Sequence, residues 1–150
     1  MITQKQITAF LACKNLAIAG ASRDKKKFGN QVMHELMRKG FTVFPVNPGA
    51  EEIDGLKVYP DVLSLPEAVE SVLIVTPKAK TKSMLEQALQ KGIKHIWIQQ
   101  MADSPEALDY ATENGMDVIY GKCILMHAGP VKGVHGFHRF FMKLFGKMPK

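Results

Sequence analysis

The sequence contains few of the residues and segments that mark secreted, membrane or metal-binding proteins. It has 2 cysteines in 150 residues, Cys13 and Cys123, which are far apart and form no metal-type spacing. We expect both to be free thiols in a reducing compartment. No apolar run approaches the roughly 20 residues that cross a bilayer. Residues 1–11 lack the charged start, apolar middle and cleavage site of a signal peptide. We therefore expect a cytoplasmic protein without a membrane span.

The residue patterns of common active sites are also missing. No serine–histidine–acid triad, carboxylate pair or metal cluster stands out, so we predict no catalytic residue. Of the five histidines, His34 and His95 fall in a predicted helix and a predicted strand, where structural roles are expected. His135 and His138 have a spacing of three residues but lack a third ligand, so we predict no metal site.

The composition is that of one ordinary globular domain. The hydrophobic fraction is 46% and the charged fraction 23%, and 150 residues suffice for one core. The formal net charge of +6 suits an anionic partner. Basic residues gather at 23–27, at 78–82 and from Lys132 onward.

An alternating pattern of strands and helices runs through most of the chain. Apolar runs that end in turn residues predict strands at 16–20, 41–46, 71–75, 93–98 and 116–120. Helical spacing predicts helices at 2–13, 28–38, 78–91 and 105–114. Residues 50–65 read as a loop with a short extended piece at Val58 and Tyr59.

This alternation predicts an α/β fold, a Rossmann-like, doubly wound parallel five-stranded sheet covered on both faces. We expect the strand order 3-2-1-4-5. The whole chain, 1–150, is predicted to be a single domain with its core at about 14–127 and a basic, aromatic tail at 128–150.

The tail carries an aromatic stripe. Phe137, Phe140, Phe141, Leu144 and Phe145 recur at helical spacing, with cationic residues largely off the stripe. We predict a C-terminal amphipathic helix that packs on the domain or across a dimer interface. A basic element for a membrane surface or a nucleic acid is the alternative, although we expect no nucleic acid as the main partner.

The ligand site is expected where the strands end. In doubly wound sheets, ligands bind beyond the carboxyl ends of the strands. Here those ends carry Gly20–Arg23, Asn47–Pro48, Thr76–Pro77, Gln99 and residues 120–123.

Gly20-Ala21-Ser22 lies between a predicted strand and a predicted helix. Glycine permits a tight turn, Ser22 offers a hydroxyl, and the helix offers free N–H groups and a positive dipole end. Ser22 and Lys25 stand where the dinucleotide fingerprint needs its second and third glycines, and the P-loop pattern is missing too. The loop instead continues through a basic run, Arg23 to Lys27, that can neutralise several phosphates.

The end of the second strand argues against a nicotinamide dinucleotide. NAD-binding domains carry an acidic residue there that holds the ribose hydroxyls. This chain has Pro45-Val46-Asn47-Pro48 and no carboxylate.

These segments resemble a known family. The runs Ala19–Ser22, Lys27–Asn30, Val46–Gly49 and Val58–Pro60 are similar to those of the small CoA-binding domain family, itself similar to the N-terminal domain of the succinyl-CoA synthetase alpha subunit. Ile96–Gln100 and Gly121–Ile124 add to the resemblance, which covers roughly residues 16–127.

The resemblance implies a Rossmann-like domain that holds coenzyme A along the strand ends. Gly20, Ala21 and Ser22 would meet the phosphates. Arg23 and a lysine of the 25–27 run would neutralise them. Asn47 and Pro48 would flank the adenosine, and Gln99 would lie near the pantetheine. The cofactor-binding set that it implies is Gly20, Ala21, Ser22, Arg23, Lys25, Lys27, Asn47, Pro48, Val75, Thr76, Pro77, Lys78 and Gln99.

The synthetase's catalytic histidine belongs to a separate domain, so the resemblance implies binding more than catalysis. The leading hypothesis is a module for CoA or acyl-CoA that is non-catalytic alone, acting as a homodimer or beside a CoA-using enzyme. The alternative is a small NAD(P)-dependent oxidoreductase with an atypical phosphate loop. Cys123 could form a mixed disulfide with the CoA thiol, although a buried, apolar role is the favoured interpretation.

Overall fold

A computed structural model describes residues 2–128. Its helices are α1 (Gln4–Ala12), α2 (Phe28–Arg38), α3 (Lys78–Lys91), α4 (Pro105–Glu113) and the 3-10 turn η1 (Ile124–Met126). Its strands are β1 (Asn15–Ala19), β2 (Thr42–Val46), β3 (Glu52–Ile53), β4 (Leu56–Lys57), β5 (Ser71–Ile74), β6 (His95–Gln99) and β7 (Val118–Lys122). The tail helix that the sequence predicts lies outside the described residues.

The main sheet confirms the predicted fold class and corrects the predicted strand order. It has five parallel strands in the order β2-β1-β5-β6-β7. The predicted order would place the strand at 71–75 outside β2. Instead β5 pairs with the other side of β1, where Leu16 lies opposite Ser71. Both orders belong to doubly wound folds.

The chain between β2 and β5 explains this correction. Tyr59 donates its N–H to the carbonyl of Pro45 at 2.9 Å, and Asn47 donates to the carbonyl of Tyr59 at 2.9 Å. The returning chain therefore occupies the outer edge of β2, in a parallel bridge between Val46 and Tyr59. The free edge of β1 is left for β5. The predicted extended piece at Val58 and Tyr59 is this edge segment.

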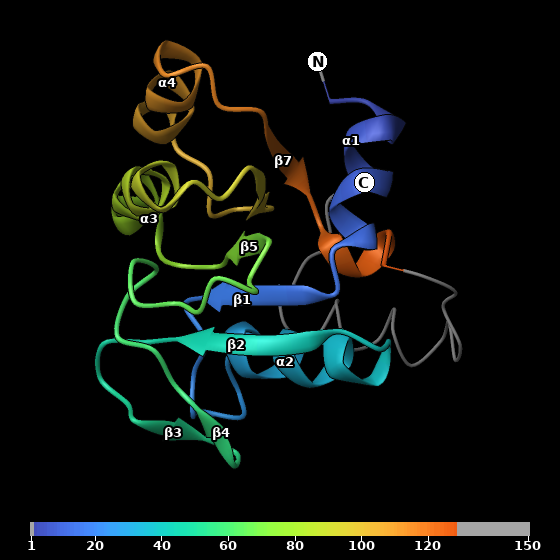
Figure 1. Ribbon diagram of the computed structural model, residues 1–150, viewed down its shortest axis with the longest axis vertical. Coiled ribbons are helices and arrows are strands. Elements are labelled where there is room, and N and C mark those ends of the chain that lie inside the picture. Colours follow the sequence, from blue (N-terminus) through green and yellow to red (C-terminus); the bar gives the residue numbers. More distant parts are fainter. Residues whose placement is uncertain (1, 129–150) are drawn as a thin grey trace.

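A hairpin in the same connection was missing from the sequence prediction. β3 and β4 pair antiparallel through a two-residue turn, Asp54-Gly55, at which φ is 49° and 86°. Two positive φ values are the mark of a type I′ turn, for which Asp-Gly is a favoured sequence. The sequence signal for this turn is the Asp54-Gly55 pair between the apolar residues Ile53 and Leu56. In Figure 1 the hairpin lies beyond β2, away from the other strands.

Helices cover both faces of the sheet, as the alternation of side chains requires. Leu16 and Ile18 of β1 pack in one core with α1, α2 and η1. Ala17 and Ala19 pack in the other with α3 and α4. Figure 1 shows α3 and α4 on one side of the strands and α1 on the other.

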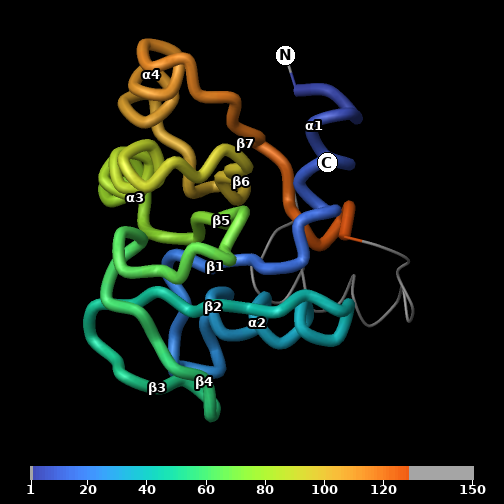
Figure 2. Tube along the Cα trace, in the orientation of Figure 1, coloured from blue at the N-terminus to red at the C-terminus, as the bar shows by residue number. Residues whose placement is uncertain are grey.

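α1 and the segment after β7 both pack against Trp97, on the face of the sheet that α1, α2 and η1 cover. The rings of Phe10 in α1 and Trp97 pack in a T-shaped arrangement with their centroids 5.3 Å apart, and the ring centroids of His127 and Trp97 are 5.8 Å apart. The Cα trace in Figure 2 accordingly places α1 beside the segment that follows β7. The Trp97 Nε1 donates to the carbonyl of Lys122 at 3.0 Å, which anchors this segment.

Two helices begin at residues with side-chain caps, and one predicted strand boundary is corrected. Thr3 caps α1 in a capping box, and Ser104 caps α4 with Pro105 at the next position. The last strand begins at Val118, two residues later than predicted. Its start is delayed because the N–H of Met116 still bonds to the carbonyl of Ala111 and so belongs to the end of α4.

Candidate functional site

Three strand ends meet where the sequence predicted a ligand site. β1 lies between β2 and β5, so its carboxyl end is flanked by both neighbours. Gly20 donates its N–H to the carbonyl of Val46 at 3.2 Å, and Val75 donates to the carbonyl of Ala19 at 2.8 Å. The predicted residues at 20–22, 47–48 and 75–78 are therefore brought together. Gln99 ends β6, one strand further along the sheet.

Two glycines permit the close packing at this junction. Gly20 has φ +105°, and a Cβ atom there would lie 2.9 Å from the carbonyl carbon of Val75. Gly29, in the first turn of α2, lies against the carbonyl oxygen of Gly20, which a Cβ atom would overlap. The start of α2 can thus approach the end of β1 closely, as a phosphate loop requires.

Two asparagine side chains hold the carbonyl groups of the loop. The Asn47 Nδ2 donates to the carbonyl of Ala21 at 2.8 Å, and its Oδ1 accepts from the N–H of Gly49 at 2.7 Å. The Asn30 Nδ2 donates to the carbonyl of Ser22 at 2.8 Å. Asn30 is buried, with 3% of its surface exposed. Sequence reasoning included Asn47 as a contact to adenosine and left Asn30 out of the site.

The basic loop that follows is locally ordered by side-chain hydrogen bonds. The Ser22 Oγ accepts from the N–H of Asp24 at 3.0 Å, and an Asp24 carboxylate oxygen accepts from the N–H of Lys26 at 2.9 Å. The Gln31 side chain donates to the carbonyl of Lys25 at 2.8 Å. Residues 23–27 are all exposed. Their cationic side chains are therefore accessible to an anion in solution.

The two helices that begin at this junction lack the caps that the other two possess. α2 and α3 follow Lys27 and Pro77, neither of which makes a side-chain capping bond, and no acidic residue lies in either first turn. α1 and α4 are capped by Thr3 and Ser104. The partial positive charge at the starts of α2 and α3 is thus unneutralised, and it favours an anion. Lys78, the exposed first residue of α3, adds a cation.

Some of the predicted ligand residues are buried. The Thr76 hydroxyl contacts that of Thr81 at 3.3 Å, and Thr81 donates to the carbonyl of Ala102 at 2.6 Å. The Gln99 Oε1 accepts from the N–H of Ile124 at 3.1 Å, while its buried Nε2 has no hydrogen-bond partner within residues 2–128. Pro48 and Pro77 are exposed. Their contacts to a ligand remain predictions.

The thiol of Cys123, at the carboxyl end of β7, is buried. Cys123 follows β7 directly, whereas Gly121, predicted to end the strand, lies within it. Cys123 is 3% exposed, and burial raises the pKa of its thiol. Burial likewise lowers the pKa of His127, with a smaller contribution from the charge of Lys122.

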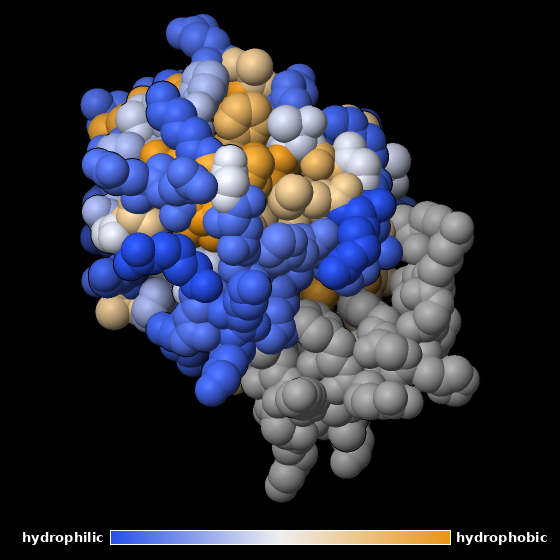
Figure 3. Space-filling view, turned by 90° about the horizontal axis from the view of Figure 1, so that it is seen from below, coloured by the Kyte–Doolittle hydropathy of each residue, from blue (hydrophilic) through white to orange (hydrophobic). Residues whose placement is uncertain are grey.

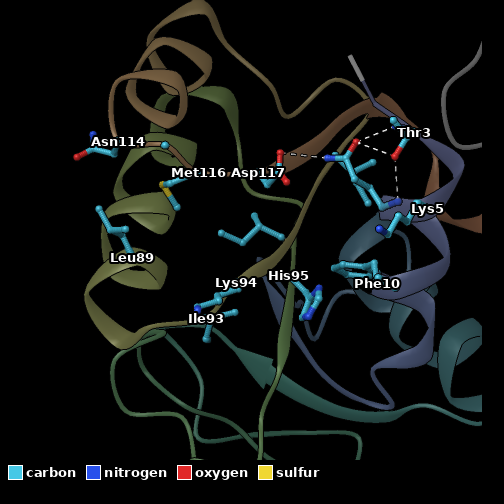
Figure 4. Close-up of a pocket in the computed structure, with 15 residues that line it drawn as sticks. Thr3, Lys5, Phe10, Leu89, Ile93, Lys94, His95, Asn114, Met116 and Asp117 are labelled. Atoms are coloured by element: carbon cyan, nitrogen blue, oxygen red, sulfur yellow. Dashed lines mark hydrogen bonds between the residues drawn. The ribbon is translucent and has the colours of Figure 1, made fainter.

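A pocket of about 840 Å³ lies at the other end of the strands, away from their carboxyl ends. It opens beside the amino ends of β6 and β7, and none of the predicted ligand residues lines it. Figure 4 shows Lys5 and Phe10 of α1 on one side, Leu89 and Asn114 on the other, and His95 between them. The pocket is therefore separate from the site at the carboxyl ends.

The described part of the chain contains neither a metal-binding cluster nor a membrane-spanning helix. No group of three or more His, Cys, Asp or Glu residues there could hold a metal ion. None of the helices between residues 2 and 128 is long and apolar enough to cross a membrane. The face in Figure 3 carries hydrophilic residues around a smaller central hydrophobic area.

Comparison with known proteins agrees with this geometry. The family model described as a CoA binding domain matches residues 14–128. The alpha subunit of an ADP-forming acetate–CoA ligase from Pyrococcus furiosus is 32% identical over an alignment 126 residues long, which covers 77% of this chain. The alignment covers 28% of that protein, so the chain spans less than a third of the relative's length.

Solved structures support the same assignment. A conserved hypothetical protein of Pyrococcus furiosus has a TM-score of 0.73 and 35% identity, covering 75% of this chain and 97% of its own. A hypothetical protein of Pyrococcus horikoshii has a TM-score of 0.77 and 35% identity, covering 83% of this chain and 89% of its own. The resemblance proposed from sequence is confirmed. The chain belongs to the CoA-binding domain family and is related to the CoA-binding domain of ADP-forming acyl-CoA ligases.

Proposed function

We propose that this domain binds coenzyme A, free or acylated, at the junction of β1, β2 and β5. The observation that carries the proposal is the loop after β1, which leads to an uncapped helix start through exposed cationic residues. CoA carries a pyrophosphate and a ribose phosphate, and such a junction favours phosphate groups. Because the chain belongs to the CoA-binding domain family, CoA is the phosphate-containing ligand that we propose.

The roles follow the order of the strands. Gly20, Ala21 and Ser22 meet the phosphates, and Arg23 with Lys25 or Lys27 neutralises them. Asn47 and Pro48 lie at the end of β2, on the adenosine side. Val75, Thr76, Pro77 and Lys78 continue the path, and Gln99 stands near the pantetheine.

We propose binding rather than catalysis by the domain alone. Ligation of acetate to CoA belongs to the relative named above, of which this chain spans 28%. The polar side chains of the site residues at the carboxyl ends are cations, amides and hydroxyls, which suit recognition of an anion. A CoA-using enzyme or a second copy of the chain is the proposed partner.

A thermal-shift titration tests the ligand. CoA, acetyl-CoA, NAD, NADP and ATP are compared, each at increasing concentration. At 100 times its dissociation constant a ligand stabilises the fold by about 2.7 kcal/mol. For a domain of this size we expect Tm to rise by about 5–10 °C with CoA, and much less with NAD.

Arg23→Ala and Lys94→Ala form a matched pair for locating the site. Both side chains are exposed, but Lys94 lies at the amino edge of β6. The CoA-induced shift should fall in the first variant and persist in the second. A larger shift with NAD or NADP than with CoA would replace this proposal with the oxidoreductase hypothesis.

A further inference from the structure

Two consecutive carbonyl groups of the phosphate loop are each held by a side-chain amide. The Asn47 Nδ2 donates to the carbonyl of Ala21, and the Asn30 Nδ2 donates to the carbonyl of Ser22, both at 2.8 Å. The two asparagines come from different elements, the end of β2 and the first turn of α2. Neither bond is needed to complete a helix or the sheet.

Because each peptide group is planar, a hydrogen bond that fixes its carbonyl also fixes the direction of its N–H group. In a trans peptide the carbonyl and the following N–H point in opposite directions. The carbonyl of Ala21 shares its plane with the N–H of Ser22, and that of Ser22 with the N–H of Arg23. Within the described structure, neither of these N–H groups donates to a protein acceptor. Consecutive free N–H groups that a turn directs to the same side form an anion-binding concavity.

We propose that Asn30 and Asn47 are positioning residues that turn the loop into an anion receptor. They hold the carbonyl dipoles toward the protein and so present the N–H groups of Ser22 and Arg23 to a phosphate. This inference rests on the proposed function. Without the two amides, either peptide could rotate and place a carbonyl oxygen, with its partial negative charge, beside the phosphate.

The hairpin determines which way the Asn30 amide points. The Asn30 Nδ2 carries two hydrogens, and the second is donated to the Asp54 Oδ2 at 2.9 Å. The same carboxylate oxygen lies 2.8 Å from the Nε2 of His34, one helical turn further along α2. Because a carboxylate only accepts hydrogen bonds, it fixes the amide nitrogen of Asn30, and not its oxygen, toward Asp54 and Ser22. Asp54 thus supports the loop through Asn30.

Calorimetric titration with CoA and amide hydrogen exchange of the ligand-free protein test the proposal together. In Asn47→Ala and in Asn30→Asp we expect the Kd for CoA to rise about tenfold, since one hydrogen bond to the loop is lost. The N–H groups of Asp24, Lys26 and Lys27, which are hydrogen-bonded within the loop, should exchange faster even without ligand. The control is Asn15→Ala, whose Nδ2 donates to the carbonyl of Ala68, remote from the loop. It should change neither readout.

A reciprocal exchange separates positioning from a merely structural role. In Asn30→Asp combined with Asp54→Asn, the new amide at position 54 can donate to the new carboxylate at position 30. The link between hairpin and α2 is restored, but nothing at position 30 can donate to the carbonyl of Ser22. We expect Tm to recover while CoA affinity and loop exchange stay impaired. Recovery of all three would overturn the proposal.

The outcomes also distinguish this inference from the proposed function. If the unmodified protein binds no CoA, the proposed function fails, and binding of inorganic pyrophosphate then replaces CoA as the affinity readout. If CoA binds normally and both asparagine variants keep its Kd and the loop exchange unchanged, the positioning role alone is refuted.

Discussion

Gly29 in the first turn of α2 lies directly against the carbonyl oxygen of Gly20 at the end of β1, with no room for a Cβ atom between them. We predict that Gly29→Ala lowers the free energy of unfolding by about 1–3 kcal/mol, because the overlap forces the helix away from the strand. The intrinsic helix propensity of alanine opposes this by about 1 kcal/mol. Urea unfolding gives the value.

Gly49→Ala serves as the control for that substitution. The nearest atom to a Cβ there is the Asn47 Oδ1 at 3.4 Å, an ordinary contact. We expect a change within about 0.5 kcal/mol. Equal losses in the two variants would show that the contact between Gly29 and Gly20 has no special importance.

Lys78 provides a test of the electrostatic contribution of α3. Its charge lies at the uncapped start of that helix, where it would attract a phosphate. We predict that Lys78→Ala raises the Kd for CoA severalfold at low salt, and that the effect shrinks as ionic strength rises, since exposed charges are screened. Lys80→Ala, two residues further along the same helix and also exposed, should have a smaller effect. A salt-independent loss would contradict the electrostatic explanation.

The Asp54 carboxylate should make stability depend on pH in the acid range. Hydrogen bonds from Asn30 and then from His34 lower its pKa below the ordinary value. An aspartate in an unfolded chain titrates at about pH 3.9. Because the folded pKa is the lower one, this stabilisation is fully present above about pH 4 and is lost as pH falls through the folded value.

We therefore expect Asp54→Asn to remove part of the acid-induced loss of stability. Urea midpoints measured from about pH 5 down to pH 3 should fall less steeply in the variant than in the unmodified protein. Parallel slopes for the two proteins would mean that the contacts of Asp54 in the structure do not persist in solution.

The two thiols should be poorly reactive in the folded protein. Cys13 and Cys123 are 8% and 3% exposed, and burial raises the pKa of both thiols. The thiolate is the reactive form, so alkylation near neutral pH should be much slower in the native state than in denaturant. Mass spectrometry after incubation with oxidised CoA should show no adduct. An adduct that disappears in Cys123→Ser would instead establish the mixed disulfide.

Much of the fold follows from local sequence patterns alone. Apolar runs that end in turn residues place the parallel strands to within two residues, because buried strands must be apolar on both faces. The predicted helices at 28–38 and 78–91 have the observed bounds. Gly20, Ser22 and the basic run also predict an anion site from sequence, since a strand, a glycine turn and a helix start suffice for this prediction.

The tertiary structure decides what depends on contacts between distant segments. The position of β5 beside β1 depends on Tyr59 occupying the edge of β2, which no local pattern encodes. The bond between Asn30 and Asp54 likewise joins residues 24 positions apart. Asparagine suits a cap, a turn or a buried amide equally well in sequence. Only the packed fold brings the Asn30 and Asn47 amides to adjacent carbonyls, because hydrogen-bond partners are selected by position in space.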